Sequence, residues 1–322
     1  MDDERPIFIL GIQRGGTNQV LNILRSHPAT FWPQGEFHEV FRPRRLRNEG
    51  LSAFGKLWRY APVLATAGDI LNPDRKPHRP GLLRETRGAA VRAGLERSAA
   101  ANAGSVARYK QALRERGFFA APAVPERMLV KVMNYNVGFA EDLAALYPKA
   151  RFLGILRDGL AVCEGHIARG ATPAAAAEAY GFVARQLIEF EAAGLPLRTW
   201  RFEDLLREPA RVSRELYAFC GLDPEATQGV CLQDKERILD AEGKVRGVRK
   251  VDLYYRFEEM GRHMRTEVNA GAHARLAPAH RAEIETRCAD VLRHFGYPEE
   301  VPASAPPATA DAAGERLEAL GH

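Results

Sequence analysis

Short apolar runs recur along the chain and alternate with segments of helical periodicity. The runs cover residues 7–12, 127–132, 151–156 and 196–202. Runs of this length are typical of buried strands, whereas apolar positions repeating every three or four residues are typical of helices. Strands that alternate with helices predict crossover connections and a parallel sheet flanked by helices, with the ligand at the carboxyl ends of the strands. We therefore predict an α/β fold.

Two later segments, 209–223 and 282–297, show clear helical stripes. Cys220 and Cys288 fall on their apolar faces, so we expect buried thiols there. The other two cysteines are Cys163 and Cys231, and no two of the four form a C-x-x-C pair. This spacing indicates neither a zinc site nor a disulfide framework, and it suits a reducing compartment.

The chain has 322 residues and 46% hydrophobic content, which fits one elaborated domain. We expect that domain to span 1–298 and the Ala/Pro-rich segment 299–322 to be a disordered or loosely attached tail. No apolar run approaches the ~20 residues of a membrane span, and the first strand follows the charged start too closely for a signal peptide. The expectation is a soluble, cytoplasmic protein with no transmembrane segment.

Residues 41–127 carry a net excess of positive charge. They hold 18 Lys/Arg against 7 Asp/Glu, an excess of +11 in a chain whose net charge is +5. We predict a basic helical insertion, placed to serve as an acceptor lid and to favour an anionic acceptor. A solvated arginine-rich surface is the alternative. The segment lacks a nucleic-acid-binding motif, so no nucleic-acid partner is expected.

The first strand runs into a glycine-rich turn and a helix. Gly11 and Gly16 are spaced as in G-x-x-x-x-G-K-S/T, in which backbone N–H groups and a helix N-terminus hold phosphate. Thr17 replaces the lysine of that motif and Asn18 its magnesium-binding hydroxyl, which disfavours a triphosphate with magnesium. Either residue is a candidate N-cap. The loop's cation is Arg14, and a turn without a ligand is the alternative.

The turn resembles the 5′-phosphosulfate loop of sulfotransferases, commonly P-K/R-S-G-T-T. Here it reads Gln13, Arg14, Gly15, Gly16, Thr17 and Asn18. The resemblance implies the sulfotransferase fold and a donor, 3′-phosphoadenosine 5′-phosphosulfate, whose product is 3′,5′-adenosine bisphosphate. It also implies that Arg14 lies against the leaving phosphate. Gln13, Gly15 and Asn18 depart from the commonest residues of the family.

A second segment, 147–170, carries the same resemblance. Arg157, Asp158 and Gly159 match the family's R-D-P/G step at the end of a strand, where the arginine and a serine eight residues later hold the donor's 3′-phosphate. The serine position is Gly165, so His166 or Arg169 is a candidate substitute. The alternative is that Arg157 forms a structural ion pair with Asp158 or a helix C-terminus.

Two further stretches extend the resemblance to about 6–40 and 128–297. Residues 198–223 are similar to the family's V-R-Y-E-D-L-x-x-x-P, where we expect Glu203 and Asp204 to cap a helix near Arg201 rather than bind magnesium. Segment 242–251 lies where sulfotransferases fold a basic loop over the 3′-phosphate. We predict a flexible loop in which Arg249 and Lys250 bind that group, with a solvated charge run as the alternative.

The catalytic base must reach the acceptor hydroxyl. The bacterial and tyrosylprotein-sulfotransferase-like branches are the most similar, and the C-G-E-E sequence of the latter maps onto Glu36, our candidate base. His38 and Glu39 are alternatives. Lys131 matches a family lysine in K-x-P and leans toward the phosphosulfate, unless it is a strand-end lysine reaching solvent.

These assignments imply a sulfotransferase that moves a sulfuryl group to a hydroxyl, less readily an amine, of a glycan, glycolipid or other anionic small molecule. No metal is required, because backbone N–H groups and fixed cations stabilise the developing charge. Two alternatives remain: a small-molecule kinase that uses ATP and magnesium, and a non-catalytic anion-binding homologue. The sequence leaves the acceptor and the oligomeric state open.

Overall fold

The computed structural model describes residues 5–41, 81–83, 88–120, 122–239, 245–264 and 266–297. The expected tail and the insertion residues 42–80 and 84–87 lie outside this part. In chain order the elements are β1 (Ile7–Gly11), α1 (Thr17–Ser26), β2 (Thr30–Phe31), η1 (Phe37–Phe41), α4 (Gly88–Glu115), β3 (Arg127–Met133), η2 (Asn134–Phe139), α5 (Ala140–Leu146), β4 (Arg151–Leu156), α6 (Gly159–Ile167), α7 (Pro173–Ala192), β5 (Leu197–Arg201), α8 (Phe202–Arg207), α9 (Pro209–Phe219), β6 (Gly229–Leu239), β7 (Val245–Arg256), α10 (Phe257–His263), α11 (Ala270–Arg275) and α12 (Pro278–His294).

The central sheet is parallel and has five strands in the order β2-β3-β1-β4-β5. The four predicted strands are confirmed as β1, β3, β4 and β5. Only β2, which is two residues long, lacks a corresponding apolar run in the prediction. β1 is central: Gly11 pairs with Met133 of β3 on one side and with Ile155 of β4 on the other. The carboxyl end of β1 therefore opens between two neighbouring strands.

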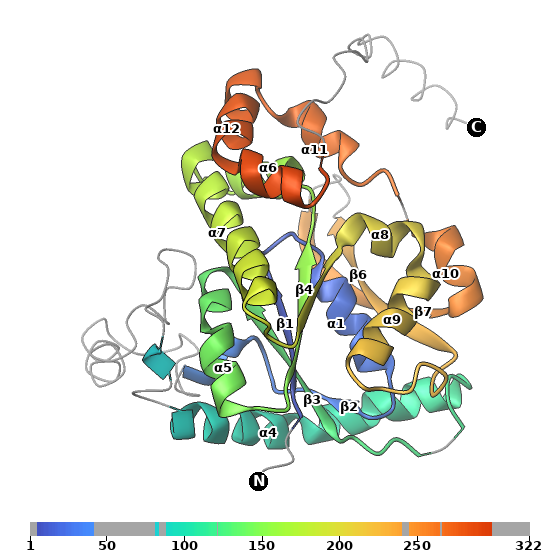
Figure 1. Ribbon diagram of the computed structural model, residues 1–322. Helices are drawn as coiled ribbons and strands as arrows, with labels where there is room; N and C mark the ends of the chain where they lie inside the picture. Colours follow the sequence, from blue (N-terminus) through green and yellow to red (C-terminus); the bar gives the residue numbers. More distant parts are fainter. Residues whose placement is uncertain are drawn as a thin grey trace, which may run out of the picture.

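Alternate residues of β1 pack into two separate cores. Phe8 and Leu10 join the core beneath α5, α7 and α12. Ile7 and Ile9 join the core beneath α1 and α9. Because successive side chains of a strand point to opposite faces, a continuous apolar run implies burial on both faces. The fold has three layers, helix, sheet and helix, as Figure 1 shows.

Helix α4 confirms that part of the basic insertion is helical. It spans 28 residues and crosses the molecule near the amino ends of the strands (Figure 1). Ser98 Oγ accepts a hydrogen bond from Gln34 N at 3.0 Å, and Asn102 Nδ2 donates to Trp32 O at 3.1 Å. These bonds attach α4 to the segment between β2 and η1.

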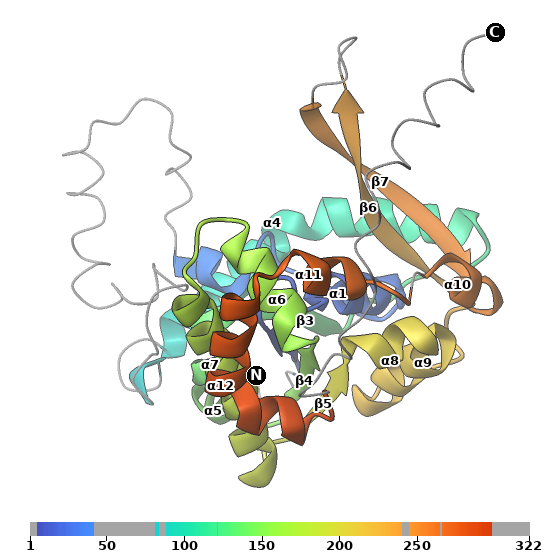
Figure 2. The same ribbon diagram turned by 90° about the horizontal axis from the view of Figure 1, so that it is seen from above.

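An antiparallel hairpin, β6 and β7, forms a second sheet that packs on α1. Figure 2 shows its far end extending away from the central sheet. The helices expected over 209–223 and 282–297 are present as α9 and α12, and all four cysteines are buried and free. In the described part of the chain, no helix is long and apolar enough to cross a membrane.

Candidate active site

The turn between β1 and α1 has a strained backbone. Gly16 has φ +92°, and a Cβ atom there would lie 2.1 Å from the Phe202 ring. Both the positive φ and the lack of space require glycine at this position. Arg14 adopts φ +70°, which is uncommon outside glycine. Gly16, not Thr17 or Asn18, is the N-cap residue of α1, and no side chain caps the helix. The N-cap prediction is therefore wrong.

Backbone N–H groups converge at this helix start. Gly15 N donates to Ile12 O at 3.0 Å, and Gln13 N donates to Asn134 Oδ1 at 3.0 Å. Within the described residues, the N–H groups of Arg14, Gly16, Thr17 and Asn18 have no protein acceptor. The first N–H groups of a helix lack intrahelical partners and carry partial positive charge, so this cradle suits an anion.

Lys131 joins the loop to the candidate base. Its Nζ donates to Asn18 Oδ1 at 2.8 Å and lies 2.7 Å from Glu36 Oε1. His38 Nδ1 lies 3.7 Å from the other Glu36 oxygen. The structure thus brings together Glu36, His38 and Lys131, which were predicted separately, and places them beside the start of α1. The side chain of Glu39 lies outside the described part.

Arg157 lies at the end of β4, against the segment before α11. Its Nη2 donates to Val268 O and its Nε to Asn269 Oδ1, both at 2.8 Å, while Nη1 is 3.4 Å from Arg14 O. Burial lowers the pKa of Arg157, and the nearby Glu203 carboxylate opposes that shift. Asp158 caps α6 by accepting from Ala161 N, and His273 Nε2 lies 2.7 Å from the same oxygen; among the described residues Arg157 forms no ion pair with Asp158, which was one of the two partners of the structural alternative.

The Arg14 side chain lies along α6. A Cβ atom added to Gly165 would be 3.2 Å from Arg14 Cγ, so the stem of the arginine crosses the serine position of the family. Burial lowers the pKa of the Arg14 guanidinium, and the positive charge of Arg169 lowers it further. His166 Nε2 is 3.3 Å from Gln13 O, which ties α6 to the loop.

Glu203 connects three parts of the chain. Its carboxylate accepts from Asp158 N at 3.0 Å, from Asn269 Nδ2 at 2.7 Å and from the Tyr297 hydroxyl at 2.8 Å. Asp204 pairs with Arg207 instead. Neither residue caps a helix near Arg201, because α8 has no side-chain cap. That prediction is wrong. Three further residues hold this region together and were not predicted from the sequence: Asn134, Asn269 and Tyr297.

Arg249 and Lys250 lie in strand β7. The prediction of a flexible loop is therefore wrong for residues 245–250. Arg249 pairs in register with Glu236, and its side chain is exposed. The side chain of Lys250 lies outside the described part. Both belong to the half of the hairpin that extends away from the central sheet (Figure 2). The segment that contacts Arg157 is 268–269.

A parallel sheet whose central strand ends in a glycine turn and a helix N-terminus defines the class of P-loop-like, phosphate-binding α/β proteins. The sequence pattern of the sulfotransferase family matches residues 6–226. The chain belongs to this family, and its membership supports a sulfotransferase function. No curated protein matches the sequence.

Solved structures support the fold. The sulfotransferase domain from the curacin biosynthetic pathway is similar at 16% identity, covering 94% of this chain and 100% of that one, with a TM-score of 0.50. The sulfotransferase domain of the Synechococcus PCC 7002 olefin synthase is 18% identical, with 94% and 98% coverage and a TM-score of 0.48. A sulfotransferase from Alicyclobacillus acidocaldarius is 14% identical, with 92% and 97% coverage and a TM-score of 0.41. The first of these carries the argument: the chain has the sulfotransferase fold.

Proposed function

We propose that this protein transfers a sulfuryl group from 3′-phosphoadenosine 5′-phosphosulfate to a hydroxyl of an acceptor. The observation that carries the proposal is the Asn18–Lys131–Glu36 cluster. It puts a carboxylate and an ammonium group beside a helix start whose N–H groups lack acceptors. An anion and a proton acceptor are both needed for this reaction, and the cluster supplies a place for each.

The residues present fit a phosphosulfate donor. Backbone N–H groups of Gly16, Thr17 and Asn18 are available to phosphate oxygens. Arg157 and Arg14 provide two guanidinium groups on the α6 side of the loop, and guanidinium binds phosphate with paired hydrogen bonds. Because the stem of Arg14 crosses Gly165, we assign Arg14 to the 3′-phosphate together with Arg157, in place of the leaving phosphate that the family resemblance implied. The bound donor would supply the activated sulfuryl group.

Charge must be stabilised on the leaving phosphate as the sulfuryl group moves. We assign this role to the N–H groups at the start of α1 and to Lys131, since both are fixed before the reaction begins. Glu36 is the proposed base that takes the acceptor proton. A positioned base of this kind contributes roughly 10²- to 10⁴-fold to the rate.

The acceptor is proposed from charge alone. The excess of +11 over residues 41–127 favours an anionic hydroxyl compound such as a glycan, a glycolipid or a small molecule. Part of this charge lies on α4, near the amino ends of the strands and away from the candidate active site. The lid assignment therefore remains a prediction for residues 42–80, which lie outside the described part.

A kinase is the second candidate, and two contacts count against it. Asn18 stands where the kinase loop binds magnesium, and its carbonyl oxygen already accepts from Lys131. Glu203 stands after a strand, where a magnesium-binding acid could lie, and its carboxylate already accepts three hydrogen bonds. These bonds use one of the two lone pairs of Asn18 Oδ1 and three of the roughly four acceptor sites of the Glu203 carboxylate, which leaves little of either for a metal.

Thermal unfolding separates the candidates. 3′,5′-Adenosine bisphosphate should raise the melting temperature and ATP with magnesium should not, since a ligand at 100 times its Kd adds ~2.7 kcal/mol. Mass spectrometry of candidate acceptors incubated with donor and enzyme should then show the gain of one sulfate. Stabilisation by ATP with magnesium alone would overturn the proposal.

The role of Glu36 is tested by Glu36→Gln. We expect turnover to fall by about 10²- to 10⁴-fold with little change in the affinity for 3′,5′-adenosine bisphosphate, because the base contacts the acceptor and not the nucleotide. His38→Ala is the matched control. Near-normal turnover in Glu36→Gln, with a large loss in His38→Ala, would transfer the role to His38.

A further inference from the structure

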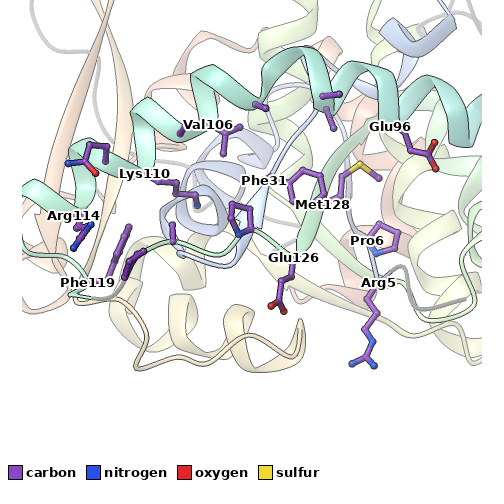
Figure 3. A pocket seen from close by; sticks show the side chains of 18 residues that line it. Arg5, Pro6, Phe31, Glu96, Val106, Lys110, Arg114, Phe119, Glu126 and Met128 are labelled. Carbon is purple, nitrogen blue, oxygen red and sulfur yellow. The ribbon is translucent and has the colours of Figure 1, made fainter. Parts of the chain in front are cut away.

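A cavity of about 670 Å³ lies beneath α4, away from the candidate active site. Figure 3 shows α4 on one side and the 119–126 segment on the other, with Phe31 and Met128 between them. Its lining is mainly apolar: Pro6, Phe31, Ala99, Ala100, Ala103, Val106, Ala107, Phe119, Pro122, Ala123, Pro125 and Met128. Its volume falls in the range of small-molecule sites, about 300 to 1,000 Å³.

The cavity is separate from the donor loop. Arg5 and Pro6 line it just before β1 begins, whereas the donor loop follows Gly11 at the other end of that strand. Five residues of strand span ~17 Å at about 3.3 Å per residue. A molecule in the cavity therefore does not occupy the sulfuryl-transfer site.

The cavity extends along α4. The α4 residues that line it run from Glu96 to Arg114, a rise of ~27 Å at 1.5 Å per residue. Ala99, Ala103 and Ala107 are spaced four apart on one face of α4, where small side chains leave the space open. This shape suits an extended chain better than a fused ring system.

One end of the cavity holds buried positive charge. Lys110 is 3% exposed, and its Nζ contacts only neutral oxygens: Arg25 O at 2.6 Å, His27 O, and Thr30 Oγ1 at 3.0 Å. The side chain of Arg25 lies nearby, with its guanidinium 4.6 Å from the Trp32 ring centre. In the described residues, no carboxylate pairs with either cation. A buried cation without a counter-charge is costly, and burial lowers the pKa of Lys110 well below its ordinary value.

Arg114 lies at the same end. Its Nε donates to Ala120 O at 3.2 Å, and its terminal nitrogens have no hydrogen bond within the described part of the chain. Figure 3 places Lys110, Arg114 and Phe119 together, with Glu96 near the opposite end. Glu126 lies along the middle of the cavity, and its carboxylate points away from α4. The apolar walls thus end in one cationic region.

We propose that this cavity binds a long-chain carboxylate, with the hydrocarbon chain along the alanine face of α4 and the carboxylate hydrogen-bonded to the terminal nitrogens of Arg114. The chain would cover apolar surface, and the head group would supply a counter-charge near Lys110, whose three N–H donors are already used by neutral oxygens. The proposal does not depend on the sulfuryl-transfer reaction.

The test is calorimetric titration of the full-length protein with hexadecanoate, below its micelle concentration. We expect saturable binding that weakens at least tenfold in Ala103→Phe, which fills the groove. Ala101→Phe is the control: Ala101 is exposed on α4 and does not line the cavity. Absence of saturable binding, or equal binding by both variants, would overturn the proposal.

The charge requirement is tested with hexadecan-1-ol and Arg114→Gln. The wild-type protein should bind the carboxylate at least tenfold more tightly than the alcohol, and Arg114→Gln should reduce that ratio. Arg114 is exposed, so the variant should fold. Equal affinity of the wild-type protein for acid and alcohol would refute the role of the cations.

Discussion

At position 165 this chain has glycine where the family motif described above has a serine, and the Arg14 side chain crosses that position. A Cβ atom on Gly165 would lie 3.2 Å from Arg14 Cγ and 3.8 Å from its Cβ and Cδ. The neighbour is a flexible side chain, so a serine here would displace the arginine rather than the backbone. A side chain at position 165 and the arginine at position 14 would therefore compete for the same space.

Arg14→Ala should weaken 3′,5′-adenosine bisphosphate by about 1.5 to 3 kcal/mol, the range for hydrogen bonds to charged groups. It should have a smaller effect on adenosine 5′-phosphate, which lacks the 3′-phosphate. Adding Gly165→Ser to Arg14→Ala should restore part of the loss. Calorimetric titration of both nucleotides measures this, and equal losses for the two would assign Arg14 to the 5′ side instead.

His27 is a buried residue whose protonation is opposed by its contacts. Its Nε2 is 3.0 Å from Asp223 O and donates to it, while Nδ1 accepts from Ala29 N at 3.2 Å. Both ring nitrogens are thus satisfied only in the neutral form. Burial lowers the pKa of His27 to about 4, and the hydrogen bond to Asp223 opposes that shift.

The unfolded chain therefore binds a proton at His27 below about pH 6.5, and the folded chain does not do so until about pH 4. The contribution to stability is complete above pH 6.5 and is lost as the pH falls. Between pH 7.5 and 5 we expect a loss of ~2 kcal/mol from this residue. Urea unfolding at both pH values should show that loss in the wild type and not in His27→Gln; equal losses would contradict it.

At the scale of elements, Glu203 connects several parts of the chain near the site. It links α8 to the start of α6 and to the segment before α11, and Tyr297 follows the end of α12. Glu203→Ala leaves Asp158 N and Asn269 Nδ2 without this acceptor, whereas the Tyr297 hydroxyl keeps Leu156 O at 3.2 Å. We expect a loss of about 1 to 3 kcal/mol in the free energy of unfolding.

Urea denaturation measures this loss. Asp204→Ala is the matched control, because Asp204 makes only an exposed ion pair with Arg207 and should cost about 0.5 kcal/mol or less. Similar losses in the two variants would show that Glu203 is not the connecting residue.

The elements of the central sheet could be predicted because burial on both faces demands continuous apolar runs. The hairpin was harder to predict. β7 carries several charged residues around Gly247, and its sequence gives no such run, so its strand structure depends on pairing with β6. Local composition favoured a loop, whereas the backbone hydrogen bonds of the antiparallel pair favour a strand.

The site was predictable only where a motif marks it. Glu36, Lys131 and Arg157 were identified from matching stretches, and the structure brings Glu36 and Lys131 into contact. Asn269 is different, since it reaches Arg157 across 112 positions of sequence with no motif of its own. Contacts of that range are decided by packing, which periodicity does not reveal.

For the whole molecule, the strand order has a consequence for synthesis on the ribosome. β1 lies between β3 and β4, so both of its partners are translated long after it. At ~5 to 20 residues per second, β1 waits roughly 7 to 30 s for β4 to follow it. Parallel pairing of such distant segments is slow to form. During that interval the apolar strand and its phosphate loop exist without a sheet, which makes this stretch of nascent chain a natural client for chaperones.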